Sequence, residues 1–365
     1  MRKIFQILKS LVKRVDTFLI ERGEIIKYRL RVIEYLRKNP QPGIPKNTVR
    51  EIKEFYGSKG FPGIALDWHK FYGGVQGQYY KECIPNTVFY SKIEKFLNRV
   101  EYKALQDKNI LDRIFSGAQR PVTLVKNING FFYINDTLVS REAAIRHCAE
   151  NGRFIIKPSL DTGGGKNVRL INQDLPKGPE REKMLKELFV KYSKDFIVQE
   201  VVEQSPQMAA FNPTSLNTIR ITTYLNQDGP VVLHAILRMG KEGSATDNIS
   251  GGGVCAGIDD SGRLRDETYN KYKIIIPKVI DGVPLSQMSV PNYEAVKEMV
   301  KGLHLQVPFF RLVAWDIALD RDNQPVLIEY NVTDQGVDSQ AHEGPYLGNY
   351  TDEILTEYKA ERDSK

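Results

Sequence analysis

The sequence is poor in cysteine and contains no long apolar run, and both scarcities limit what the protein can be. Three cysteines, Cys83, Cys148 and Cys255, stand far apart among 365 residues. Their spacing matches neither a zinc site nor a redox pair, which favours a reducing compartment and therefore a cytoplasmic protein. No stretch of about 18 consecutive apolar residues is present, so no membrane-spanning helix is expected.

Two common phosphate-binding motifs are also missing, although a glycine-rich stretch invites comparison with them. Residues 154–171 read FIIKPSLDTGGGKNVRLI. A Walker loop would need glycine where Leu160 stands and Ser or Thr where Asn167 stands. The dinucleotide fingerprint would need a third glycine at Val168, followed by a helix rather than a strand. Both motifs are therefore excluded.

The same stretch instead predicts a hairpin whose tip closes over a ligand. Apolar runs at 154–156 and 168–171 flank the glycines Gly163, Gly164 and Gly165. Glycines leave backbone N–H groups uncovered, and lysines add positive charge at Lys157 and Lys166, so phosphate is the expected ligand. An ordinary glycine-rich hairpin tip remains the alternative.

The net charge of +7 is concentrated near the N-terminus. Residues 1–60 hold 15 Lys/Arg and 6 Asp/Glu, so the other 305 residues together carry a net charge of −2. Residues 1–40 show two helical runs, which Pro40 and Pro42 terminate. One interpretation is a helical pair packed on the body; another is peripheral contact of a basic amphipathic surface with anionic lipid. No nucleic-acid-binding motif or aromatic stacking platform is visible, so nucleic acid is not an expected partner.

The rest of the chain predicts an α+β fold with much antiparallel sheet. Residues 41–100 are rich in Gly, Pro, Tyr and Phe and read as a loop-rich region. Mixed helices and strands follow in two parts, 101–204 and 205–345, and a helical tail covers 346–365. The strands expected in the second part lie at 218–225, 231–238, 253–258, 271–276, 311–319 and 325–332.

The final strand pair, RLVAWDIALDRDNQPVLIEYNV at 311–332, carries the clearest chemical signal. A turn centred on Asp322 and Asn323 gives cross-strand partners whose numbers sum to 645, so Asp316 lies opposite Glu329. Asn331 points to the same face, and Ala314 and Ala318 leave space beside Asp316, whereas Trp315, Ile317, Ile328 and Tyr330 read as core. Two carboxylates and one carboxamide suit Mg²⁺, as one or two ions. Incidental acids on an exposed face are the alternative.

With these residues in view, the chain resembles the ATP-grasp superfamily, and in particular the sugar-transfer-associated ATP-grasp family linked to surface-polysaccharide synthesis. The matching segments cover roughly residues 100–345. They are the Lys-Pro of FIIKPSLDTGGGKNV, the strand FIVQEVVEQ, SLNTIRITTYL, the loop DNISGGG and the D…ExN set of WDIALDRDNQPVLIEYN. The resemblance implies two α+β lobes that clamp ATP beneath a glycine-rich lid.

The resemblance also implies roles for individual residues. Lys157 and Lys108 correspond to lysines that contact the nucleotide phosphates, while Gly163 to Gly165 and Lys166 belong to the lid. The segment VQEVV corresponds to the hinge that reads adenine. Its candidate contacts are Gln199, Glu200 and Val202, with Glu203 for the ribose hydroxyls. Arg220, flanked by Ile219 and Ile221 in a strand, needs an anionic partner, which the family implies to be a transferring phosphate or acyl phosphate.

The substrate side is less defined. Arg238 and Asn248 are candidates for phosphate or substrate contact, and Asp338 and Gln340 for a substrate wall. The resemblance implies an ATP- and Mg²⁺-dependent ligase that joins a small-molecule carboxylate to an amine through an acyl phosphate. The substrates implied are an amino acid or amine and a sugar acid, saccharide-linked in some cases. A kinase that phosphorylates a hydroxyl and a non-enzymatic ATP-binding module are the alternatives.

Overall fold

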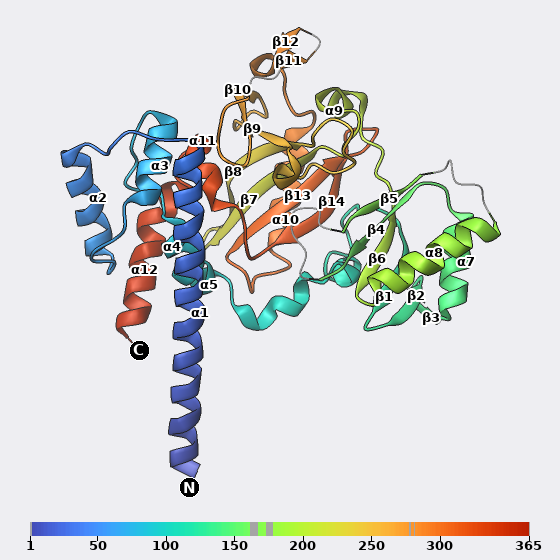
Figure 1. Cartoon of the computed structure of the whole chain (residues 1–365), viewed down its shortest axis with the longest axis horizontal. Helices are drawn as coiled ribbons and strands as arrows, with labels where there is room; N and C mark the ends of the chain where they lie inside the picture. The colour runs from blue at the N-terminus through green and yellow to red at the C-terminus, as the bar shows by residue number, and fades with distance from the viewer. Residues whose placement is uncertain (1, 161–166, 173–177, 277–278, 281, 365) are drawn as a thin grey trace.

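The computed structural model describes residues 2–160, 167–172, 178–276, 279–280 and 282–364. It combines helices with two large antiparallel sheets, and Figure 1 shows a helical module on the left beside them. The fold class is α+β, which confirms the sequence-based prediction.

The helical module is built from both ends of the chain. Its elements are α1 (Arg2–Lys38), α2 (Lys46–Ser58), α3 (Asp67–Gln76), α4 (Asn86–Val88), η1 (Phe89–Ile93), α5 (Glu94–Leu97), η6 (Val337–Ser339), α11 (Gln340–Glu343), η7 (Gly348–Tyr350) and α12 (Thr351–Asp363). One apolar core joins them, with Tyr28 of α1, Trp68 and Phe71 of α3 and Leu355 of α12 all buried in it. The two ends of the chain are therefore packed together.

Two sequence-based expectations about this module are wrong. The helical pair expected in residues 1–40 is the single helix α1, because no proline interrupts the helical pattern before Pro40. The loop-rich region expected at 41–100 is largely helical, since its aromatic residues form the core rather than loops. Gly73 occurs inside α3 because a Cβ at this position would clash with the ring of Tyr79.

The first sheet lies between a pair of helices and the rest of the molecule. Its strand order is β3-β2-β1-β6-β4-β5, from β1 (Thr123–Ile128), β2 (Phe131–Ile134), β3 (Thr137–Val139), β4 (Phe154–Pro158), β5 (Arg169–Ile171) and β6 (Phe196–Glu200). Helices α7 (Arg141–Glu150) and α8 (Pro179–Tyr192) share its apolar core. The predicted hairpin is confirmed, because β4 pairs with β5 in antiparallel register.

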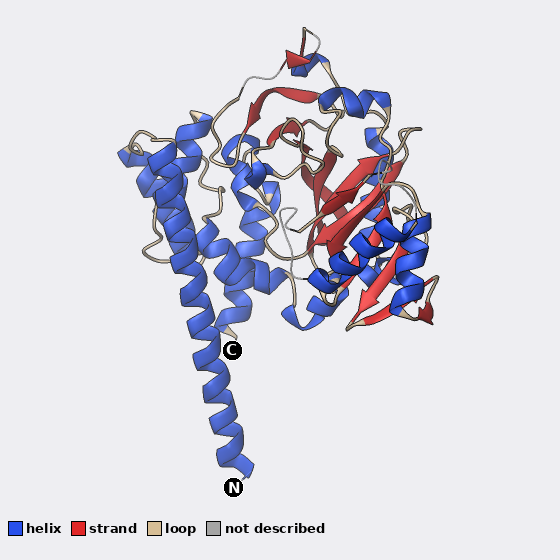
Figure 2. Ribbon diagram, turned by 45° about the vertical axis from the view of Figure 1, so that its right-hand side comes forward, coloured by secondary structure: helices blue, strands red, loops and turns tan. Residues whose placement is uncertain are grey.

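The second sheet has the order β10-β9-β8-β7-β13-β14. Its strands are β7 (Thr218–Asn226), β8 (Gly229–Met239), β9 (Val254–Ile258), β10 (Leu264–Tyr269), β13 (Leu312–Leu319) and β14 (Pro325–Asn331). Helices α9 (Pro206–Phe211) and α10 (Tyr293–His304) belong to the core on one of its faces. Figure 2 shows both sheets in one view, with the red strands of the second behind those of the first.

Short elements connect these parts. They are η2 (Val100–Gln106), η3 (Lys108–Ile110), α6 (Leu111–Ile114), η4 (Ile249–Gly251), β11 (Val279–Ile280), β12 (Val283–Pro284) and η5 (Leu285–Gln287). The strand expected at 271–276 is wrong. The side chain of Asn270 accepts hydrogen bonds from the backbone N–H groups of Tyr272 and Ile274, which closes a tight turn instead.

Candidate functional site

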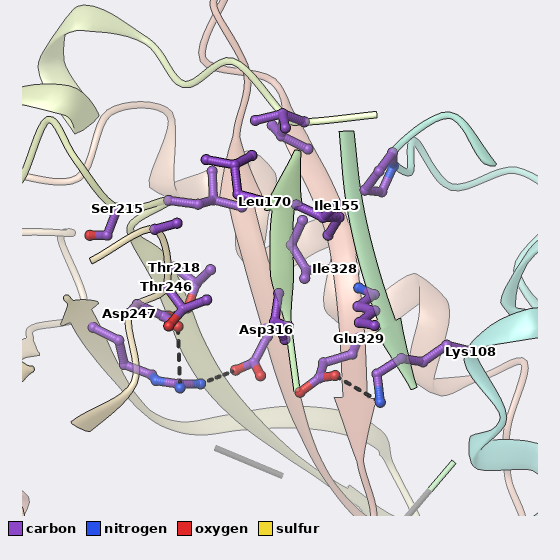
Figure 3. Close-up of a pocket in the computed structure, with 18 of the residues that line it drawn as sticks. Lys108, Ile155, Leu170, Ser215, Thr218, Thr246, Asp247, Asp316, Ile328 and Glu329 are labelled. Carbon is purple, nitrogen blue, oxygen red and sulfur yellow. Dashed lines mark hydrogen bonds and ion pairs between the residues drawn. The ribbon is translucent and has the colours of Figure 1, made fainter. Parts of the chain in front are cut away.

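A cavity of about 690 Å³ lies between the two sheets. The first sheet supplies lining residues from β4, from β5 and from the segment after β6, and the second sheet supplies them from β7, β8, β13 and β14. In Figure 3, Ile155, Leu170 and Ile328 gather at one end of the cavity, and charged side chains occupy the other. The cavity therefore has an apolar end and a charged end.

Two carboxylates lie side by side at the charged end. Asp316 of β13 pairs with Glu329 of β14, as the sequence predicts. Asn331 lies on the same side, with its Nδ2 3.4 Å from Oδ2 of Asp316. Opposite Asn331 stands Ala314, whose small side chain leaves room on this face. These three residues supply carboxylate and amide oxygens only, and this donor set fits Mg²⁺.

Arginines compensate the charge of Asp316. Arg220 of β7 is its partner on the adjacent strand and donates hydrogen bonds from Nε at 2.8 Å and Nη2 at 2.6 Å. Arg238 of β8 donates another from Nη1 at 3.1 Å. Burial alone would raise the pKa of the Asp316 carboxyl, but the two guanidinium groups outweigh it and hold that pKa well below its usual range. Asp316 is therefore ionised.

Two lysines approach the acids from the side of the first sheet. Lys108 of η3 forms an ion pair with Glu329, with 3.2 Å between Nζ and Oε2. Lys157, near the end of β4, is only 6% exposed. Burial, reinforced by the charge of Lys108, lowers the pKa of Lys157 to about 8, although Glu329 opposes this. The structure thus brings together Lys108, Lys157, Glu329 and Asp316, as the sequence-based interpretation requires.

The expected adenine hinge follows β6. Glu200, Val202 and Glu203 line the cavity, and Arg321, in the turn between β13 and β14, forms an ion pair with Glu203. Gln199 does not line the cavity. Its side chain is buried and donates a hydrogen bond to Oγ1 of Thr123 on β1, at 3.3 Å. Only the backbone of Gln199 is thus left as a candidate nucleotide contact.

Two acidic residues that line the cavity, Asp247 and Asp334, were missed by the sequence analysis. Asp247 lines the cavity, where its Oδ1 lies 3.4 Å from Nη2 of Arg238 and its Oδ2 accepts a hydrogen bond from Thr218. Burial raises the pKa of Asp247, although Arg238 opposes the shift. The neighbouring candidate Asn248 instead caps η4, accepting a hydrogen bond from the N–H of Ser250 at 3.0 Å. The DNISGGG motif signalled this loop but not which of its residues faces the cavity.

Two substrate candidates lie outside this cavity. Gln340 is fully buried, and its amide accepts from the N–H of Ile84 at 3.0 Å and donates to the carbonyl of Ile84 at 2.7 Å. Asp338 accepts a hydrogen bond from Tyr35 of α1 at 2.9 Å and pairs with Lys273 at 3.6 Å. Gln340 therefore joins two parts of the helical module, and Asp338 links that module to the turn after β10, rather than forming a wall of this cavity.

The predicted lid cannot be placed. Gly163, Gly164, Gly165 and Lys166 lie outside the residues that the structure describes. Within the described ranges, no group of three or more His, Cys, Asp and Glu side chains is arranged to hold a metal. A cation at this site would therefore depend on the two carboxylates and Asn331, together with groups of its ligand.

This arrangement defines a class of site. A cavity with one apolar end, lysines and arginines at the other, and a pair of carboxylates among them fits a nucleoside phosphate bound together with a divalent cation. Comparison with known families then gives the family. The model of the sugar-transfer associated ATP-grasp family matches residues 88–354, and the chain belongs to this family. The prediction made from the sequence motifs is confirmed.

The solved structures that match this chain are distant from it. The chain is 14% identical to an L-amino acid ligase from Bacillus licheniformis, with a TM-score of 0.37 over 64% of this chain and 42% of that one. It is 14% identical to the D-cycloserine synthetase DcsG, with a TM-score of 0.41 over 70% of each chain. It is 15% identical to the ATP-grasp ligase PsnB, solved with minimal precursor, Mg and ADP, with a TM-score of 0.41 over 72% of this chain and 62% of that one.

The chain therefore spans less than half of the first of these ligases and less than two thirds of the third. A comparison with curated protein sequences found no match.

Proposed function

We propose that the protein is an ATP- and Mg²⁺-dependent ligase that joins a carboxylate to an amine through an acyl phosphate. The observation that carries the proposal is the row formed by Glu329, Asp316 and Arg220 on three neighbouring strands. This row sets a pair of acidic oxygen ligands directly beside an arginine whose side chain is 18% exposed. Membership of the sugar-transfer associated ATP-grasp family supports the nucleotide part of the proposal.

The charged end of the cavity would bind the phosphates of ATP. Lys157 and Lys108 would contact phosphate oxygens, and Ile155, Leu170 and Ile328 would cover the adenine. The carboxylates of Asp316 and Glu329, with Asn331, would hold Mg²⁺. When bound, Mg²⁺ neutralises charge on the β- and γ-phosphates, which promotes phosphoryl transfer.

The arginines would bind the reacting carboxylate. A carboxylate oxygen attacks the γ-phosphorus, the bond to the bridging oxygen of ADP breaks, and ADP leaves. Arg220 and Arg238 would stabilise the resulting acyl phosphate, because both contact Asp316 and their side chains are only 18% and 10% exposed. An amine then attacks the acyl carbon, phosphate leaves with the bonding electron pair, and the nitrogen loses a proton to give the amide.

The family description points to the substrates. It associates these proteins with sugar transfer, and we therefore propose a sugar acid, free or saccharide-linked, as one substrate and an amino acid or other amine as the second. Surface-polysaccharide synthesis would be the pathway. Arg238 forms ion pairs with both Asp316 and Asp247. Asp247 is therefore close to the residues that would hold the metal, and its carboxylate is the one best placed to attract the ammonium group of such an amine.

The reaction products provide the test. The protein would be incubated with ATP and Mg²⁺ across panels of uronic acids and amines, and ADP, AMP and phosphate would be measured, with Glu329→Gln as control. ADP and phosphate released only with a matched carboxylate and amine support the ligase. ADP formed with a phosphorylated sugar would identify a kinase instead, and AMP would contradict the mechanism. ATP binding without turnover on any panel would favour a binding module.

A further inference from the structure

Helix α1 carries apolar residues on two nearly opposite sides, and only one of these sides is covered. Tyr28, Val32 and Tyr35 are 0%, 1% and 8% exposed and pack into the helical module. Residues two positions earlier, Ile26, Leu30 and Ile33, are 57–62% exposed. Two positions correspond to about 200° around an α-helix, so the second set faces away from the body.

The exposed apolar set continues toward the N-terminus. Val15, Phe18, Leu19 and Ile20 are 50–61% exposed. Figures 1 and 2 both show the N-terminal half of α1 extending beyond the rest of the chain. We call Val15, Leu19, Ile26, Leu30 and Ile33 the outer stripe. Its residues span 19 positions, or about 27 Å of helix. Soluble proteins commonly expose single, scattered apolar residues, but not a row of five along one side of a helix.

The charges along α1 indicate what covers this stripe. Arg22, Arg29 and Arg37 are exposed and lie within about 65° of the outer stripe around the helix. If a second copy packed in parallel along the stripe, these cations would lie side by side and would repel one another. An anionic lipid surface would attract them while it accepts the apolar side chains. Within the described residues, no helix is long and apolar enough to cross a bilayer.

We propose that α1 lies along an anionic membrane surface, with the outer stripe in the lipid headgroup region and the body on the other side of the helix. This inference concerns a surface distinct from the ATP cavity and goes beyond the proposed function. The buried side of α1 is tied to the cavity wall, because Tyr28 donates a hydrogen bond at 2.7 Å to Asp334, which lines the cavity. Membrane contact along α1 would therefore hold the cavity at a fixed position relative to the lipid.

Sedimentation with lipid vesicles tests the proposal on the full chain. Vesicles of phosphatidylcholine alone would be compared with vesicles that also contain phosphatidylglycerol. We expect binding to the anionic vesicles only, decreasing as salt rises. The double variant Leu19→Glu, Ile26→Glu should weaken that binding by about tenfold or more.

A matched control separates the stripe from general surface effects. Val190 is 60% exposed and belongs to α8, which packs on the first sheet and is not part of the outer stripe. Val190→Glu should therefore leave vesicle binding unchanged. Circular dichroism and thermal melting of every variant confirm that it folds. ATP affinity of the double variant should equal that of the parent chain, which keeps this test independent of the proposed function.

Several outcomes would overturn the proposal. Equal binding to neutral and anionic vesicles would remove the role of charge, and unchanged binding of the double variant would remove the role of the stripe. A dimer seen by analytical ultracentrifugation without lipid, and lost in the double variant, would show that a second copy covers the stripe instead.

Discussion

Arg220 and Asp316 form a two-point contact at the charged end of the cavity, with Nε and Nη2 of the guanidinium at 2.8 and 2.6 Å from the two carboxylate oxygens. Arg238 reaches the same carboxylate at 3.1 Å. The oxygens that would hold a divalent cation are therefore already bound by arginine. Lys108 likewise holds Glu329, so cation and lysine would compete for that carboxylate.

This competition predicts that a divalent cation binds the protein weakly unless a nucleotide is present. The phosphates of ADP would attract Lys108 and the arginines and so release the carboxylates. Mn²⁺ binding, followed by electron paramagnetic resonance, should be about tenfold tighter or more with ADP than without it. Arg238→Gln should strengthen Mn²⁺ binding in the absence of nucleotide, because it removes one competing charge. Equal Mn²⁺ affinity with and without ADP would contradict the prediction.

Substitutions of Asp316 and Glu329 should differ in their effect on stability but not in their effect on activity. Asp316→Asn leaves Arg220 and Arg238, whose side chains are largely buried, without a full negative charge and should lower the free energy of unfolding by about 3–5 kcal/mol. Glu329→Gln breaks a single, more accessible pair with Lys108 and should cost about 1 kcal/mol or less. Both variants should lose about 100-fold or more in ATP turnover. Urea unfolding and product analysis measure the two effects, and equal destabilisation would refute the argument.

The hairpin formed by β13 and β14 shows why its chemistry could be predicted from the sequence. The predicted register pairs Asp316 with Glu329, and the structure has this pair. Nearer the turn the register differs by one residue, because a bulge follows Asp316 and Ile317 pairs with Leu327. Leu327 is therefore fully buried, whereas Ile328, predicted to be core, lines the cavity. Alternation fixes which residues share a face, but a bulge leaves no clear signal in one sequence.

The loops and the helical module were harder to predict. Asp247 faces the cavity because the Asn248 side chain turns back to cap η4, and both residues are equally plausible from sequence. Gln340 follows β14 closely in sequence, yet it is hydrogen-bonded to Ile84, more than 250 positions away. Such long-range backbone contacts depend on how the two ends of the chain pack, and no local pattern encodes that packing.

Lys157 should make nucleotide binding dependent on pH. Its pKa is lowered from 10.5 to about 8 in the folded protein, so its positive charge is present below pH 8 and lost as pH rises through that value. ADP affinity should therefore fall above about pH 8. Lys157→Arg should remove this dependence, because guanidinium stays charged, and Lys157→Met should bind weakly throughout. Isothermal titration calorimetry across pH 6.5–9.5 (roughly 1.5 units on either side of the shifted pKa) measures the effect.

The same shift has an opposite consequence for folding. Between about pH 8 and 10.5 the unfolded chain holds a proton at Lys157 that the folded protein has released. The unfolded state therefore binds more protons, and this site makes the free energy of unfolding rise with pH over that window. Lys157→Met should abolish this contribution.

A parent chain whose ADP affinity is flat from pH 7 to 9 (within about one unit of the shifted pKa) would show that Lys157 does not contact phosphate.

Gln340 should affect stability and not catalysis. Its buried amide bonds both backbone groups of Ile84, and Oε1 also lies 3.4 Å from the N–H of Tyr346. Gln340→Met keeps the volume but leaves those groups unpaired, which should lower the free energy of unfolding by about 2–4 kcal/mol. At a temperature where the variant is folded, the KM values for all substrates should match those of the parent chain. Asp247→Asn should show the reverse pattern, because Asp247 lines the cavity: a raised KM for the amine and a small change in stability. A raised KM for one substrate in Gln340→Met, with stability unchanged, would return Gln340 to the substrate site.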